Sequence, residues 1–153
     1  MAGLVLVRYM NTHQRKLGEE FLAHAVEFVR ASQRLRSQKP FLYHPTFYCA
    51  LHGLELALKS HLAADGFSKA RLAGRKLGHD LESLLTHALK RGSVLQPQLI
   101  PTVQRTVRAG SKSYARKCFE YPEFFVTTVH IDRWIAVAER IIRSADEKLS
   151  AKV

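Results

Sequence analysis

YHPTFYCALHGLELALKSHL (residues 43–62) and, after a short basic connector, GHDLESLLTHAL (residues 78–89) decide the fold of this chain. In the first stretch, apolar residues recur every three or four positions, at Phe47, Leu51, Leu54, Leu58 and Leu62. This period is that of an α-helix with a buried face. Pro45 suits a first helical turn, and Asp65-Gly66 supplies a stop. The pattern therefore predicts one helix that begins near Pro45 and ends near Gly66.

The second stretch has the same period and its own boundary signals. Its apolar positions are Leu81, Leu84, Leu85, Ala88 and Leu89. Asp80 stands directly before them, where a short acceptor side chain caps a helix. Arg91-Gly92 follows, and a cation and a glycine are typical of a helix C-terminus. These residues predict a second helix, entered through Gly78-His79-Asp80.

Helical periods also occur on both sides of this pair. One helix is predicted from about Gln14 to Ser37, where Lys39-Pro40 disfavours continuation. Another begins at Pro97 or Pro101, both of which fit a first turn. Residues 1–12 leave a short helix and an extended arm equally open.

A last helix is expected from about Val129, capped by Thr127 or Thr128, with a core stripe that includes Trp134 and Ile141. Short connectors join the predicted helices, and strand signals are few. The fold class predicted is all-α, a four- to five-helix up-and-down bundle, with residues 1–153 forming a single domain.

The amino-acid composition limits the classes of protein to which this chain can belong. Apolar residues make up 46% of the 153, too many for a disordered chain. Only Cys49 and Cys118 are present, so neither a disulfide framework nor a zinc cluster is indicated, and reduced thiols are expected. No apolar run approaches a membrane span or a signal peptide. We expect a cytoplasmic protein without metal or cofactor.

The positive charge is concentrated in the middle of the chain. The net charge is +11, and residues 67–118 hold eleven Lys/Arg against two Asp/Glu, a local net charge of +9. The predicted anion-binding residues are Lys69, Arg71, Arg75 and Lys76 in the connector, and Arg105, Arg108, Lys112 and Arg116 on the polar side of the fourth helix. Such a concentration attracts polyanions. Free N–H groups at the start of the helix that follows the connector, the one entered through Gly78-His79-Asp80, are expected to add to this attraction.

Two sequence motifs, taken together with the distance between them along the chain, resemble those of the HEPN superfamily of helical domains. They are GLELALKSHL (residues 53–62) and GHDL (residues 78–81), followed by Leu84-Leu85; FEYPE (residues 119–123) is similar to an aromatic-proline segment before the last helix. The resemblance covers roughly residues 40–145. It implies a four- or five-helix bundle that commonly dimerises. It also implies a role in toxin–antitoxin or other RNA-directed systems, or beside a small nucleotidyltransferase.

Catalytic members of that superfamily are metal-independent ribonucleases, whose Arg and His are separated by about four to six residues near the start of the last long helix. This chain departs from the motif, because His130 is the only histidine in residues 105–150 and Arg116 lies too far upstream. Arg75 and His79 are one residue short of the range. Arg8 and His13 match the spacing, but at the other end of the chain.

His79 is the remaining candidate for a general base, since imidazole titrates near neutrality. The positive end of the helix dipole disfavours an imidazolium there. The prediction is a neutral His79, hydrogen-bonded to nearby backbone or to Glu55. Glu55 and Lys59 are interpreted as an i,i+4 pair on the flank of their helix.

The interpretation is a non-catalytic HEPN-like module that binds RNA, a nucleotide or a protein partner. Two alternatives stay open. One is a metal-independent ribonuclease that uses Arg8, His13 or His79. The other is a homodimeric interaction module without nucleic acid, whose candidate contact residues are Phe41, Tyr43, Phe47, Phe124 and Phe125.

Overall fold

The computed structural model describes residues 11–92, 95–115 and 131–151, with only the backbone of residues 112, 113 and 115. The helices are α1 (Thr12–Ser37), α2 (Tyr43–Ala64), α3 (Lys69–Ala73), α4 (Leu81–Lys90), the 3₁₀ turn η1 (Pro97–Leu99), α5 (Ile100–Ala115) and α6 (Ile131–Ala151). No strand occurs in these three ranges. The predicted all-α helical bundle is confirmed.

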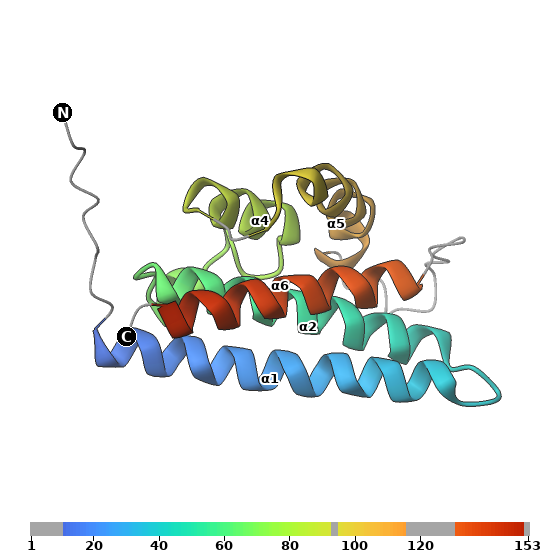
Figure 1. Cartoon of the computed structure of the whole chain (residues 1–153). Helices are drawn as coiled ribbons and strands as arrows, with labels where there is room; N and C mark the ends of the chain where they lie inside the picture. The colour runs from blue at the N-terminus through green and yellow to red at the C-terminus, as the bar shows by residue number, and fades with distance from the viewer. Residues whose placement is uncertain (1–10, 93–94, 116–130, 152–153) are drawn as a thin grey trace.

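The helices form two layers (Figure 1). The long helices α1, α2 and α6 pack side by side, and the shorter α4 and α5 lie over them. Helix α2 contacts α1, α6 and α4, so it is enclosed on several sides. Every residue from Gly53 to Ala64 is buried as a result. The sequence predicted one buried stripe on α2. The buried surface is wider than that stripe, because the second layer of helices covers another side of α2.

Several predicted boundaries are confirmed. Asp80 accepts a hydrogen bond from the Ser83 backbone N–H at 3.0 Å, as an N-cap does. Gly66 and Gly92 have φ values of +93° and +78°, the left-handed conformation that ends a helix. Pro97 opens η1, which leads directly into α5.

Two boundaries differ or lie outside the described ranges. Residues 69–73 were expected in a connector but form the short helix α3, with the Ser68 hydroxyl capping the Arg71 N–H at 3.2 Å. Helix α6 is described from Ile131, and the predicted caps Thr127 and Thr128 lie outside the described residues, as does Val129.

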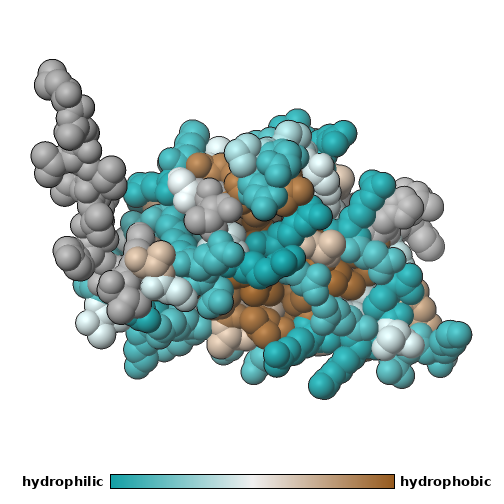
Figure 2. Space-filling model, in the orientation of Figure 1, coloured by the Kyte–Doolittle hydropathy of each residue, from teal (hydrophilic) through white to brown (hydrophobic). Residues whose placement is uncertain are grey.

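Most of the face seen in Figure 2 is hydrophilic, with an apolar strip exposed where α1 and α6 run alongside each other. A groove of about 330 Å³ lies between these two helices, lined by Val29 and Ile142 among others. None of the described helices combines the length and the apolar character needed to cross a bilayer.

Close packing of α2 on α1 requires a glycine at position 53. A Cβ atom there would lie 2.7 Å from Val29 Cγ2, and 3.2 Å from both the Ala25 carbonyl oxygen and the Val29 backbone nitrogen. The side-chain contact can shift, but the backbone atoms of α1 cannot without separating the helices. We expect Gly53→Ala to lower the free energy of unfolding by about 2 kcal/mol, measured by urea denaturation.

Gly74→Ala is the matched control. A Cβ at Gly74 would meet only backbone oxygens at 3.4 Å, and its φ of −69° suits alanine. This variant should stay within about 0.5 kcal/mol of the wild type. Equal stabilities for the two variants would contradict the close approach of α1 and α2.

Candidate functional site

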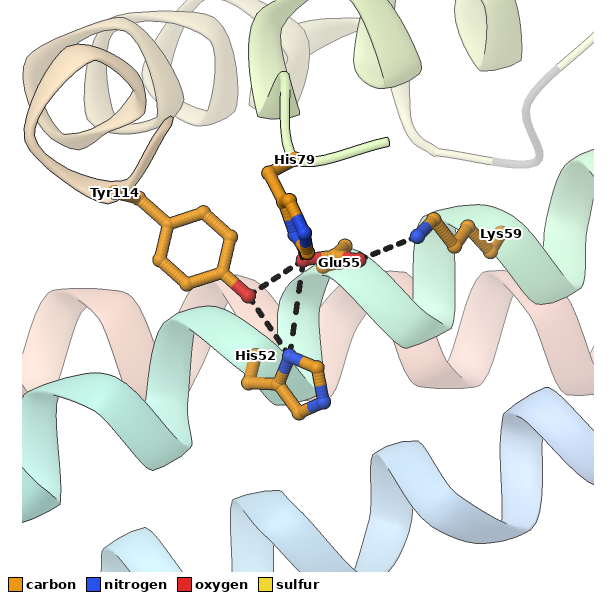
Figure 3. Close-up of polar contacts among 5 residues, drawn as sticks. All are labelled: His52, Glu55, Lys59, His79 and Tyr114. Atoms are coloured by element: carbon orange, nitrogen blue, oxygen red, sulfur yellow. Dashed lines mark hydrogen bonds and ion pairs between the residues drawn. The ribbon is translucent and has the colours of Figure 1, made fainter. Parts of the chain in front are cut away.

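The carboxylate of Glu55 joins α2 to the upper layer (Figure 3). Its side chain is 1% exposed. Its Oε1 accepts a hydrogen bond from the Lys59 ammonium, and its Oε2 accepts one from the Tyr114 hydroxyl of α5. Nδ1 of His79, in the segment before α4, lies 3.1 Å from the same Oε2. One buried carboxylate therefore fixes three parts of the chain.

Two opposing effects set the pKa of Glu55. Burial raises the pKa, but contacts with His52, Lys59 and Tyr114 outweigh it and bring the pKa to about 2, from an ordinary 4.5. The carboxylate is thus ionised at neutral pH. It can only accept hydrogen bonds in that state, so each neighbour must donate to it.

This requirement fixes which ring nitrogen of His79 carries the proton. Nδ1 carries the proton that faces Glu55, so a neutral imidazole presents the lone pair of Nε2 away from the carboxylate. The His79 side chain is 55% exposed. Of the two partners predicted for His79, nearby backbone or Glu55, the structure shows Glu55.

A second imidazole lies on the inner side of the same network. His52 Nδ1 is 2.8 Å from the Tyr114 hydroxyl and 3.7 Å from Glu55 Oε2. Since that hydroxyl donates to Glu55, it accepts from His52. Tyr48 stacks on the His52 ring and Phe28 meets it edge-on, so the ring is held in place.

The predicted i,i+4 pair of Glu55 and Lys59 is confirmed, but its expected position on the flank of the helix was wrong. Both side chains are buried, because α4 and Tyr114 cover this side of α2. A buried ion pair whose partners are all hydrogen-bonded is costly to break, since either charge left alone loses its compensation.

The start of α4 is closed to an incoming anion, which corrects the expectation of free N–H groups there. The Asp80 carboxylate accepts from both the backbone N–H and the hydroxyl of Ser83. The N–H of Glu82 donates to the Ser111 hydroxyl at 3.3 Å. Burial raises the pKa of Asp80, but the bonds from Ser83, Glu82 and Ser111 lower it overall, so a negative charge already occupies this end of the helix.

We call residues 69–76 the basic segment. Its four cations, all exposed, are Lys69, Arg71, Arg75 and Lys76. None of them forms an ion pair with a carboxylate of the described residues. Leu72 and Leu77 bury their side chains in the core and hold the segment down. The backbone that carries the cations is therefore anchored, and no carboxylate of the described residues neutralises them.

The second predicted cluster is only partly supported. Arg105 is exposed on α5, and no ion pair joins it to a carboxylate in the ranges described. Arg108, also a predicted anion-binding residue, already has a carboxylate partner: its Nε lies 2.9 Å from Glu82 Oε1. The Lys112 side chain and the whole of Arg116 lie outside the described residues.

The structure describes only some of the remaining candidates, and it brings three aromatic ones together: the ring of Tyr43 lies 5.9 Å from that of Phe41 and 5.9 Å from that of Phe47, between centroids. His13 is exposed in the first turn of α1, and Arg8 lies outside the described residues. Phe47 is buried against Trp134, so it cannot serve as a surface contact. Phe41 is exposed and Tyr43 is half-buried. Phe124 and Phe125 fall in a range that is not described.

Within the described residues, no three His, Cys, Asp or Glu side chains are grouped to hold a metal ion. Cys49 is half-buried, and burial raises the pKa of its thiol. Cys118 lies outside the described ranges. Comparison with protein families, curated proteins and solved structures found no match to this chain.

Glu55 should make the stability of the protein depend on pH. Its folded pKa of about 2 lies below 4.5, so the unfolded chain binds more protons between these values. The stabilisation, about 3 kcal/mol, is complete above about pH 5 and disappears as the pH falls towards 2. Glu55→Gln should lower the free energy of unfolding by roughly that amount at pH 7, and its difference from the wild type should shrink in acid.

Urea denaturation at several pH values measures this difference. Glu20→Gln, at an exposed position on α1, is the control and should follow the wild type. Adding Lys59→Met to Glu55→Gln should restore part of the lost stability, because it removes the uncompensated ammonium. A Glu55→Gln difference that stays constant from pH 7 to pH 2 would refute the role assigned to this carboxylate.

Proposed function

We propose that the protein is a non-catalytic HEPN-like module that binds the phosphate backbone of RNA through the basic segment. The observation that carries this proposal is the set of four exposed cations within residues 69–76, none paired with a carboxylate in the part of the chain that is described. Uncompensated cations gathered on one short segment attract a polyanion and release its counterions.

The anchoring of the segment supports a binding role. His79 is tied to Glu55 three residues beyond Lys76, and Leu77 is buried between them. Gly78 N–H donates to the Gly74 carbonyl at 2.7 Å, which closes the turn that carries Arg75 and Lys76. Less backbone order then has to be acquired when the ligand binds.

The ligand feature that fits is the backbone and not the bases. Reading of single-stranded bases relies on exposed aromatic rings. Among the described residues, the large apolar side chains that are exposed are Phe41 and Leu42, between α1 and α2. The aromatic residue next to the basic segment, Phe67, is buried. Binding should therefore depend on salt and little on sequence.

Reversing the charge of the turn tests the proposal. Arg75→Glu with Lys76→Glu should weaken binding to a fluorescein-labelled single-stranded RNA by at least about tenfold at 50 mM salt. The slope of log K against log salt should fall by about 0.7 for each phosphate that the variant no longer neutralises. Fluorescence anisotropy at two salt concentrations measures both effects.

Lys16→Glu with Arg34→Glu makes the same change of charge on α1, in the other layer of the fold. This variant should bind RNA almost as the wild type does. Equal losses of affinity in the two variants would mean that total charge alone governs binding, and the proposal of a specific surface would fail.

A second candidate function is metal-independent RNA cleavage. An exposed imidazole oriented by a buried carboxylate, as His79 is by Glu55, is the arrangement of a general base. Attack by a ribose 2′-hydroxyl also needs an acid at the leaving oxygen. The other imidazole of the network, His52, points into it, so the described residues offer no second exposed imidazole there.

We accordingly expect no cleavage that depends on His79. Bulk RNA incubated with the protein in EDTA should remain intact, and His79→Ala should not change the result. His24→Ala, on the exposed side of α1, is the control. Cleavage by the wild type that is lost in His79→Ala and kept in His24→Ala would replace the binding proposal with the ribonuclease.

The partners implied by the resemblance belong to the same proposal. A second copy of the chain, a nucleotidyltransferase or an antitoxin would have surface left to dock on, because no residue of the basic segment lines the groove between α1 and α6. Light scattering on the RNA-binding samples measures self-association directly.

A further inference from the structure

Two arginines from different elements lie on one aromatic ring. Phe67, just after α2, is 1% exposed. The Cζ atom of Arg71, in α3, is 3.8 Å from the centre of its ring, and the Cζ atom of Arg91, the C-cap of α4, is 5.1 Å from it. Both arginines are exposed. The ring therefore gathers two guanidinium groups at the surface.

The acidic residue closest in sequence does not neutralise this pair. Asp65 accepts a hydrogen bond from the Lys148 ammonium, which also lies 3.3 Å from His61 Nδ1 and 3.5 Å from the Arg91 carbonyl oxygen. No ion pair joins Arg71 or Arg91 to a carboxylate in the ranges that the structure describes. Two like charges are thus held close together without a carboxylate between them.

Stacking prepares these groups for a ligand. Contact with the ring is worth roughly 0.5–1 kcal/mol for an exposed cation and restricts a long side chain before anything binds. Because both Cζ atoms are measured from one point, they are no farther apart than 8.9 Å, the sum of 3.8 and 5.1 Å. A phosphorus atom bound edge-on by two guanidiniums lies about 4 Å from each Cζ. One phosphate group thus bridges Cζ atoms up to about 8 Å apart. The upper limit of 8.9 Å exceeds this by less than 1 Å, a difference that a small movement of either exposed side chain closes.

We infer that Arg71 and Arg91, held on Phe67, form a clamp for a single phosphate of the RNA backbone. This inference rests on the proposed function and deepens it, because Arg71 belongs to the basic segment and Arg91 extends the surface onto α4. Arg91 belongs to the binding surface because it contacts the Phe67 ring, and not because it lies near the basic segment in the sequence. The guanidinium geometry, and not the charge alone, provides the binding.

Substitution by lysine separates geometry from charge. Lysine keeps the positive charge but loses the planar, two-pronged edge. We expect Arg71→Lys with Arg91→Lys to weaken binding of the labelled single-stranded RNA about tenfold or more at 50 mM salt. Each single variant should lose most of that affinity, because a bridged phosphate needs both groups. Arg30→Lys with Arg34→Lys, on α1, is the control and should bind as the wild type does.

A second probe keeps the clamp testable apart from the proposed function. In NMR titrations with inorganic phosphate, the side-chain Nε–Hε signals of Arg71 and Arg91 should shift together, and that of Arg34 should not. Shifts of both signals without RNA binding would support the clamp and overturn the proposed function. RNA binding that the double lysine variant retains in full would overturn the clamp and leave the proposed function standing. Competition by polyglutamate as strong as that by RNA would show that the ligand class is wrong.

Discussion

The buried carboxylate of Glu55 is the contact on which the arrangement of the site depends. Its two oxygens accept hydrogen bonds from Lys59 of the same helix, Tyr114 of α5 and His79 of the segment before α4. A charge with 1% exposure is stable only when its partners are all in place, because an unpaired buried carboxylate costs several kcal/mol. The upper layer is thus tied to α2 by a polar contact inside an otherwise apolar interface.

In the part of the chain that the structure describes, charged side chains are paired inside the fold, whereas those of the basic segment on the surface are not. Inside, Glu55 is balanced by Lys59, and Asp65 by Lys148. Outside, the cations of residues 69–76 have no carboxylate partner among the described residues. Like charges on a folded surface repel one another, so this concentration costs stability unless a ligand offsets it. The contrast between a neutralised interior and an uncompensated surface is what favours a polyanion as the partner.

Local signals in the sequence were reliable where the structure depends on neighbouring residues. The helix that contains Glu55 and the capping role of Asp80 follow from period and spacing, and both are confirmed. The burial of Glu55 could not be predicted, because it depends on Tyr114, 59 positions later in the chain. The ion pair of Arg108 could not be predicted for the same reason, since its partner Glu82 lies on another helix. Helix α3 was missed because five residues are too few to show a helical period.

Glu55 stays ionised in the folded protein because its hydrogen-bond partners stabilise the carboxylate. The most direct test is an NMR titration of the side-chain carboxyl carbon of Glu55 over the acid range in which the protein remains folded. We expect its signal to stay constant from pH 7 to about pH 3 and to titrate with a pKa of about 2. Titration of Glu55 at or above 4.5 would contradict the account, because the carboxylate would then lack the partners assigned to it.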